Sequence, residues 1–175
     1  MNPNAAEINA SDHGGGIRLT AFHPLARTDI DTLRARLADD PALWLPDPAT
    51  PAPGGWVTRL HAGPVSHSAL CVVGDPWTKD EQTWRPVAWQ PADAHGRVRA
   101  HHGALPAFQG DIGLVAHPAP TLVITGTYDP PGGAVGAAAD RLVLERVANA
   151  TARRWLVDAA TRLVAQAPAQ EPAPW

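Results

Sequence analysis

Alternating apolar and polar positions dominate the middle of the chain. Six short runs alternate in this way and are separated by Gly, Pro or Asp: 56–62, 66–74, 83–91, 96–105, 110–117 and 121–128. Alternation with a period of two is typical of strands, and successive short runs of this kind favour an antiparallel meander. In the central part of the second run, at 69–73, the side chains on both faces are apolar. We therefore expect one of its faces to meet the core and the other to meet a partner element.

The first part of the chain predicts one strand and one or two short helices. Residues 17–22 alternate like a strand, and a proline follows soon after them. Apolar residues then recur at helical spacing after Thr28 or Asp29, either of which can cap a helix. Pro41 interrupts this helix and leaves a second short turn. The proline-rich residues 45–55 predict a loop without regular structure.

The last predicted element is the longest. From about residue 134 to residue 166 the chain contains no proline. Side chains that recur at steps of three or four share one face, and they are Leu144, Val147, Ala148, Thr151, Trp155, Ala159 and Leu163. About 30 residues at 1.5 Å each give a helix near 45 Å long, which is longer than one small sheet is wide. Such a helix must lie along an extended surface.

Composition narrows the class of protein. The 175 residues most simply form one domain, with 45% apolar and 18% charged residues, as in a globular core. The formal net charge of -3 and the lack of a basic stripe give no support to nucleic-acid binding. Cys71 is the only cysteine, which excludes an internal disulfide and a thiolate metal cluster.

We divide the chain into a flexible leader at 1–16, one domain at 17–166 and a disordered tail at 167–175. The leader has neither a basic start nor an apolar centre, so it lacks the pattern of a secretory signal. No apolar run approaches the roughly 20 residues that a membrane span needs. A cytoplasmic protein without a membrane span is therefore expected.

A distinctive corner joins the last predicted strand to the long helix. The segment 126–151 reads GTYDPPGGAVGAAADRLVLERVANAT. Pro130 and Pro131 keep the preceding residues extended, and Gly132 and Gly133 supply the positive φ that a reversal requires. This segment resembles the C-terminal region of START-like (SRPBCC) proteins, which include birch-pollen allergen relatives and polyketide cyclases. In bacterial members a strand ending in small-Tyr-x-Pro-Pro runs through glycines into such a helix.

The order of elements extends the resemblance over residues 17–166. It implies an α+β helix-grip fold, in which a curved antiparallel sheet of about six to seven strands wraps around the long C-terminal helix. One or two short helices follow the first strand. It also implies a cavity between sheet and helix that accepts an apolar small molecule. With only two Phe and one Tyr in the chain, many inward positions would be small and would leave room for a ligand.

The side chains expected to contact that ligand are Trp84, Trp89, Arg99, His101, Tyr128 and Trp155. Each has an alternative interpretation. The tryptophans at 84 and 89 point to opposite faces of a regular strand, unless Pro86 marks a bulge. Arg99 and His101 share a face that is either solvated or a polar row inside the cavity. Trp155 and Tyr128 either fill the core and the barrel end or contact the ligand.

The sequence contains no decisive catalytic motif. No serine lies in a Gly-x-Ser-x-Gly setting, and the histidines lack metal-ligand spacing, so we expect neither a metal nor a cofactor. Three functions stay open. The chain is a carrier of an apolar or aromatic small molecule, a polyketide aromatase/cyclase-type enzyme, or a protein-interaction module with a vestigial pocket. In the enzyme, Tyr128, His101 or Arg99 would move protons or hold an enolate. Association into a homodimer is left open as well.

Overall fold

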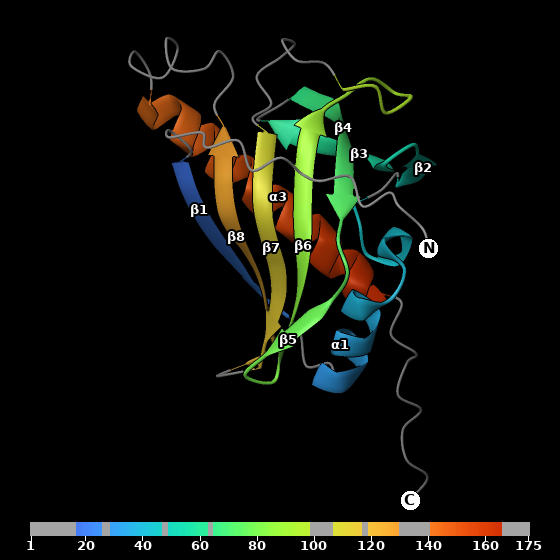
Figure 1. The fold of residues 1–175 in the computed structure, drawn as a ribbon. Helices are drawn as coiled ribbons and strands as arrows, with labels where there is room; N and C mark the ends of the chain where they lie inside the picture. The colour runs from blue at the N-terminus through green and yellow to red at the C-terminus, as the bar shows by residue number, and fades with distance from the viewer. Residues whose placement is uncertain are drawn as a thin grey trace, which may run out of the picture.

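The computed structural model describes residues 17–25, 29–46, 49–62, 65–98, 107–116, 119–129 and 141–165. A curved antiparallel sheet lies over one long C-terminal helix, with a short helix at one end (Figure 1). The described elements are β1 (Ile17–Pro24), α1 (Ile30–Ala38), the 3-10 helix η1 (Pro41–Leu43), β2 (Thr50–Ala52), β3 (Gly55–Ala62), β4 (Val65–Val73), β5 (Trp77–Lys79), β6 (Gln82–Pro91), β7 (Ala107–Val115), β8 (Thr121–Asp129) and α3 (Arg141–Ala165).

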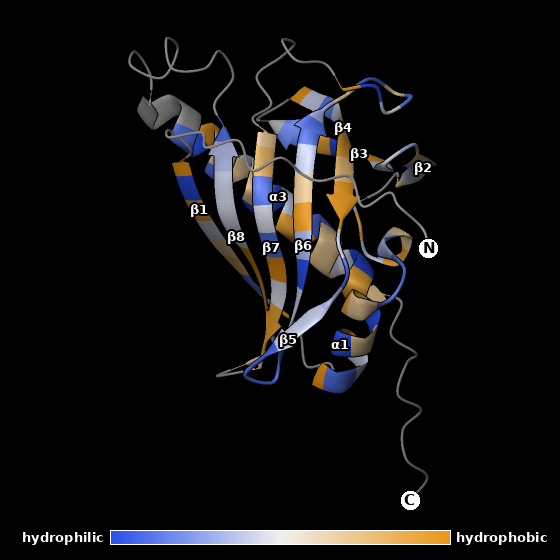
Figure 2. Ribbon diagram, in the orientation of Figure 1, coloured by the Kyte–Doolittle hydropathy of each residue, from blue (hydrophilic) through white to orange (hydrophobic). Residues whose placement is uncertain are grey.

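Seven of the eight strands of the described sheet follow the order β1-β8-β7-β6-β4-β3-β2, and the eighth, β5, pairs with β6 outside this path. The first strand therefore pairs with the last one, with Ile17 opposite Tyr128. Hydrophobic and hydrophilic residues alternate along β6 and β7, as the bands of colour in Figure 2 show. The helix-grip arrangement that the sequence predicts is confirmed, with α3 packed against β1, β3 and β8.

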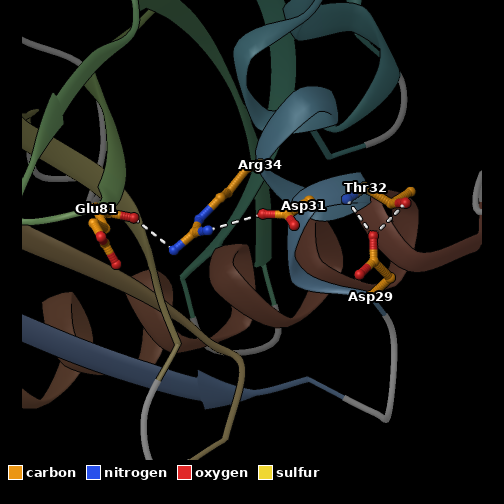
Figure 3. A network of polar contacts seen from close by, with 5 residues as sticks. All are labelled: Asp29, Asp31, Thr32, Arg34 and Glu81. Carbon is orange, nitrogen blue, oxygen red and sulfur yellow. Dashed lines mark hydrogen bonds and ion pairs between the residues drawn. The ribbon is translucent and has the colours of Figure 1, made fainter.

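Both short helices after β1 begin at a capping aspartate. The Asp29 carboxylate accepts a hydrogen bond from the backbone N–H of Thr32 at 2.8 Å and caps α1 (Figure 3). Asp40 caps η1 in the same way, through the N–H of Ala42. Each bond satisfies an N–H group that a helix start would otherwise leave without a partner. The predicted helical spacing is also found, because Leu33 and Leu37 are fully buried.

Helix α3 contains 25 residues, which at 1.5 Å each span about 37 Å. Five members of the predicted stripe are buried, whereas Val147 is only partly buried. With three neighbouring residues they form the buried face: Ala148, Thr151, Ala152, Trp155, Leu156, Ala159, Ala160 and Leu163. The alanines allow the helix backbone to approach the sheet closely. Trp155 is the largest side chain on this face.

Two short strands depart from the predicted pattern. The sequence predicts no regular structure at 45–55, but residues 50–52 form β2 and pair with the start of β3. That expectation is wrong because β2 is the edge strand, where Pro51 removes no hydrogen bond that the sheet needs. Gly54, at φ +85°, makes the turn after a proline. The second unexpected strand is β5, which follows β4 and pairs with β6.

Several predicted features fall outside the described residues. Of the run predicted at 96–105, only Val98 is seen paired, in an isolated bridge to Ala92. The Pro-Pro-Gly-Gly corner, the leader at 1–16 and the tail at 167–175 lie outside the described ranges. Within these ranges, no helix has the length and apolar character that a membrane crossing requires.

Candidate functional site

One row of mostly large side chains crosses the inner face of the sheet. The strand register aligns Trp56, Cys71, Trp89, Phe108, Tyr128 and Ile17 from β3 to β1. The Trp89 and Phe108 rings stack with their centroids 4.3 Å apart and their planes inclined by 20°. Because every member of the row lies on the core side of its strand, the row faces the space between the sheet and α3. The ligand cavity that the resemblance to START-like proteins implies is expected at this place.

The helical side of this space is lined by two further tryptophans. Trp155 of α3 lies 5.5 Å from Trp89 and 6.3 Å from Trp44, measured between ring centroids. Trp44 follows η1 and meets Trp155 edge to face, at 88°. All three rings are buried. Trp44, Trp89, Phe108 and Trp155, which we call the aromatic cluster, therefore join the sheet, α3 and the turn after η1.

A pair of glycines accommodates the Phe108 ring. Gly110 and Gly126 are opposite each other on β7 and β8. A Cβ atom added at either position would lie 2.8 Å from the Phe108 Cζ atom. The ring therefore lies over a gap that only glycines can leave. The Phe108 ring thus fills part of the space that small inward side chains were expected to leave for a ligand.

Three polar atoms in this interior are buried without a hydrogen-bond partner among the residues that the structure describes. They are the indole nitrogens of Trp44 and Trp155 and the hydroxyl of Thr151. Thr151 and Trp155 are one turn apart on the buried face of α3. A buried polar group without a partner costs about 1–3 kcal/mol, so such groups usually meet a water molecule or a ligand. The three atoms are therefore candidate hydrogen-bonding groups in the packed interior between the sheet and α3.

The Cys71 thiol belongs to the inner row but cannot serve as a nucleophile. Burial raises its pKa from the ordinary value of 9.0 to about 12. The thiolate, which is the reactive form, is therefore almost absent at neutral pH. Burial in an apolar strand therefore makes Cys71 an inert thiol.

Arg85 is the buried cation of the inner face, and it has a structural task. Its guanidinium donates to the carbonyl oxygens of Leu37 and Asp39 at the C-terminal end of α1, and to that of Gly74 after β4. Burial lowers its pKa, while nearby aspartates raise it. The guanidinium also lies 6.0 Å from the Trp44 ring. Arg85 therefore holds α1 on the sheet through its Nε and Nη1 donors.

The structure brings only some of the predicted site residues together. Trp89, Tyr128 and Trp155 are buried around the interior, as a shared site requires. Trp84 lies on the opposite face of β6, because the register with β7 runs without a bulge through Pro86. Trp84 therefore cannot line a cavity under α3. Arg99 and His101 lie outside the described residues.

Sequence reasoning misses three residues of this interior. Trp44, Phe108 and Thr151 are not among the expected ligand contacts. Thr151 is recognisable only as part of the helical stripe, and Trp44 only as an apolar residue after a proline-interrupted helix. Their convergence depends on the packing of η1 and α3 against β6 and β7, which no local pattern reveals. No group of three or more His, Cys, Asp or Glu that could hold a metal ion occurs among the described residues.

These features define a helix-grip protein with an aromatic-lined interior. No protein-family model matches the chain, and neither does a curated protein. Solved structures do match. Protein Ms6760 from Mycobacterium smegmatis is 16% identical, with a TM-score of 0.51, over 88% of this chain and 92% of its own. This likeness shows the shared fold.

Two further structures align less closely. The protein TTHA0849 from Thermus thermophilus is 11% identical, with a TM-score of 0.44, over 87% of this chain and 99% of its own. The Zhui aromatase/cyclase from Streptomyces sp. R1128 is 13% identical, with a TM-score of 0.41, over 88% of this chain and 96% of its own.

Proposed function

We propose that this protein binds an apolar or aromatic small molecule between the sheet and α3 and carries it without chemical change. The observation that supports the proposal is the set of three buried polar atoms without described partners, on Trp44, Thr151 and Trp155, beside the aromatic cluster. Aromatic walls favour a flat apolar body. Two indole N–H donors and one hydroxyl favour a carbonyl or phenol oxygen on that body.

We favour binding over catalysis because two ionisable groups of the described interior, Cys71 and Arg85, are unsuited to proton transfer. Acid–base catalysis needs a group whose pKa lies near the working pH. The pKa of Cys71 is raised to about 12, and the Arg85 guanidinium is bonded to backbone carbonyls. Neither group suits proton transfer to a substrate. An aromatase/cyclase-type enzyme would have to rely on Tyr128, Arg99 or His101.

Native mass spectrometry of freshly purified protein tests the proposal directly. We expect a small molecule to travel with the folded protein and to be released on denaturation. A parallel titration with 2-naphthol, a neutral aromatic with one hydroxyl, should shift the indole N–H resonances of Trp44 and Trp155 in a saturable way. Trp155→Phe keeps an aromatic ring but removes one donor, and should weaken 2-naphthol binding.

Two results would contradict the proposal. One is the absence of both a retained molecule and a saturable 2-naphthol shift. The other is conversion of the retained molecule into a product on incubation, which would favour the enzyme. An interaction module with a vestigial pocket would instead show neither kind of small-molecule binding.

A further inference from the structure

A pocket lies on the outer face of the sheet, away from α3. Its volume is about 270 Å³, and it is lined by Trp77, Lys79, Asp80, Gln82, Trp84, Asp111 and Thr125. Its residues come from β5, the following turn, β6, β7 and β8. In Figure 1, β5 crosses in front of the lower part of the sheet, on the side away from α3. At this volume the pocket suits one small ring better than a drug-sized molecule.

Two indole rings form the apolar part of this outer pocket. The Trp84 ring lies against the backbone of Gly113, because a Cβ atom added there would be 2.2 Å from Trp84 Cε3. The Trp77 ring stacks on it with a centroid distance of 6.0 Å and an angle of 21°. Trp77 remains 40% exposed, although it is a large apolar side chain. Its indole nitrogen donates to Asp111 Oδ1 at 3.3 Å, which fixes the orientation of the exposed ring.

The rest of the wall mixes donors with acceptors. Asp80 and Asp111 offer carboxylate acceptors, Lys79 offers an ammonium donor, and Gln82 and Thr125 offer both kinds of group. In the described part of the chain, no basic side chain forms an ion pair with Asp111. Its carboxylate therefore retains acceptor capacity beyond the single bond from Trp77.

We propose that this outer pocket is a second binding site, for a neutral polyhydroxylated ring such as a monosaccharide unit. The C–H face of such a ring would lie on the indoles. Its hydroxyl groups would donate to Asp111 and accept from Lys79 and Gln82. An organic cation would meet the Lys79 ammonium in the same pocket, and an anion would meet two carboxylates. A purely apolar ligand would leave these five polar side chains without compensation.

The outer site is separate from the interior site because β6 presents alternate residues to the two faces. Thr83, Arg85, Val87 and Trp89 are buried on the inner side, whereas Trp84 lies outside. Substitutions in the outer pocket therefore leave the aromatic cluster in place. The two proposals can fail independently.

The test is a titration of ¹⁵N-labelled full-length protein with D-glucose, D-galactose, D-mannose and N-acetyl-D-glucosamine. Concentrations up to about 50 mM are needed, because a single ring in an open pocket binds in the millimolar range. We expect at least one sugar to shift the indole N–H resonances of Trp77 and Trp84 in a saturable way. The resonances are assigned with Trp77→Phe and Trp84→Phe.

Variants locate the site. Trp77→Ala and Asp111→Ala should each weaken sugar binding by about tenfold, which corresponds to the loss of one good contact. Gly113→Ala should weaken it too, because the new Cβ displaces the Trp84 ring. Phe22→Ala is the matched control: Phe22 is 65% exposed and does not line the pocket, so sugar binding should stay unchanged. Unchanged thermal midpoints exclude unfolding as the cause.

Three outcomes would overturn the proposal. In the first, none of the four sugars produces a saturable shift. In the second, a sugar shifts the Trp155 resonance and not those of Trp77 and Trp84, which places binding in the interior. In the third, tetramethylammonium binds more tightly than every sugar, which replaces the polyhydroxylated ring by an organic cation.

Discussion

Trp155 is the residue at which the sheet, α3 and the turn after η1 meet. Its ring contacts both Trp89 and Trp44, and it is almost fully buried. We expect Trp155→Ala to lower the free energy of unfolding by about 3–5 kcal/mol, because an aromatic truncation in a core leaves a cavity. Urea unfolding followed by circular dichroism measures this. A loss below about 1 kcal/mol would mean that the neighbouring side chains can close the gap.

The indole nitrogen of Trp155 can be separated from its ring. Trp155→Phe keeps most of the packing and removes an N–H group that has no partner among the described residues. The expected destabilisation is about 1–2 kcal/mol, since relief of the unpaired donor offsets part of the lost contact. The same urea experiment on both variants compares them. An equal loss of stability for Trp155→Ala and Trp155→Phe would show that the benzene ring retained in the Phe variant contributes little to packing.

Cys71 should make stability depend on pH in the alkaline range. Its folded-state pKa of about 12 lies above the ordinary value of 9.0. Below pH 9 the thiol is neutral in both states, and its contribution is fully present. As the pH rises from about 9 toward 12, the unfolded chain ionises first, so folding loses stability.

The measurement compares urea midpoints of the wild type and Cys71→Ala at about pH 7 and about pH 10.5. We expect the wild type to lose more stability than the variant over this interval. Because all other titrating groups are common to both proteins, the difference isolates the thiol. Parallel losses would show that Cys71 ionises as freely in the folded state as in the unfolded one.

Three arginines connect neighbouring elements at one end of the molecule. Arg85 of β6 donates to carbonyls at the end of α1. Arg36 of α1 donates to the carbonyl of Leu163 in the last turn of α3, at 2.8 Å, and Arg162 of α3 donates to that of Ala42 in η1. Carbonyls at helix ends lack helical partners and attract cations. These bonds therefore hold the helical elements against one another and against the sheet.

Arg85→Met should destabilise the protein by about 2–4 kcal/mol, because the methionine retains apolar volume but leaves three carbonyls without their donor. These are the carbonyls of Leu37, Asp39 and Gly74. Arg85→Lys should lose less, since a cation remains, but it cannot reproduce the forked geometry. Thermal unfolding of both variants and the wild type ranks their stabilities. Similar stability for Met and wild type would show that water replaces the guanidinium at these carbonyls.

Regular elements of the fold were predictable where the local pattern was strong. The alternation in β3, β4 and β6 and the stripe of α3 depend on burial of one face, which the sequence displays directly. The short strands did not follow from local pattern. Strand β2 contains Pro51, which is tolerated only because the strand lies at an edge. Strand β5 has three exposed residues and no inward face of its own.

The candidate site was predictable only in part, because it depends on contacts between distant residues. Alternation alone places Trp84 and Trp89 on opposite faces, and the bulge that would have united them does not occur. The inward position of Trp155 follows from the helical stripe. The contact with Trp44 does not, since it joins residues from opposite parts of the chain.

At the scale of the whole molecule, the strand pair with the largest separation in sequence joins the first described strand to the last one. Strand β1 lies beside β8, and Thr20 and Thr125 form a hydrogen bond across 105 positions of sequence. Pairings between distant segments form slowly because a large loop must close first. In pulse-labelled hydrogen exchange during refolding, we expect amides of β3–β4 and β6–β7 to become protected before those of β1–β8. Simultaneous protection of all strands would contradict this order.

Because β6 presents alternate residues to two faces, substitutions on one face can accumulate in evolution independently of those on the other. Odd-numbered positions from Thr83 to Trp89 contribute to the interior, while Trp84 belongs to the outer pocket. A mutation at one position therefore alters one site and spares the other, although the two positions are adjacent in the gene. Related chains should vary along this strand with a period of two, and each of the two proposed binding properties could be lost or gained while the other is inherited intact.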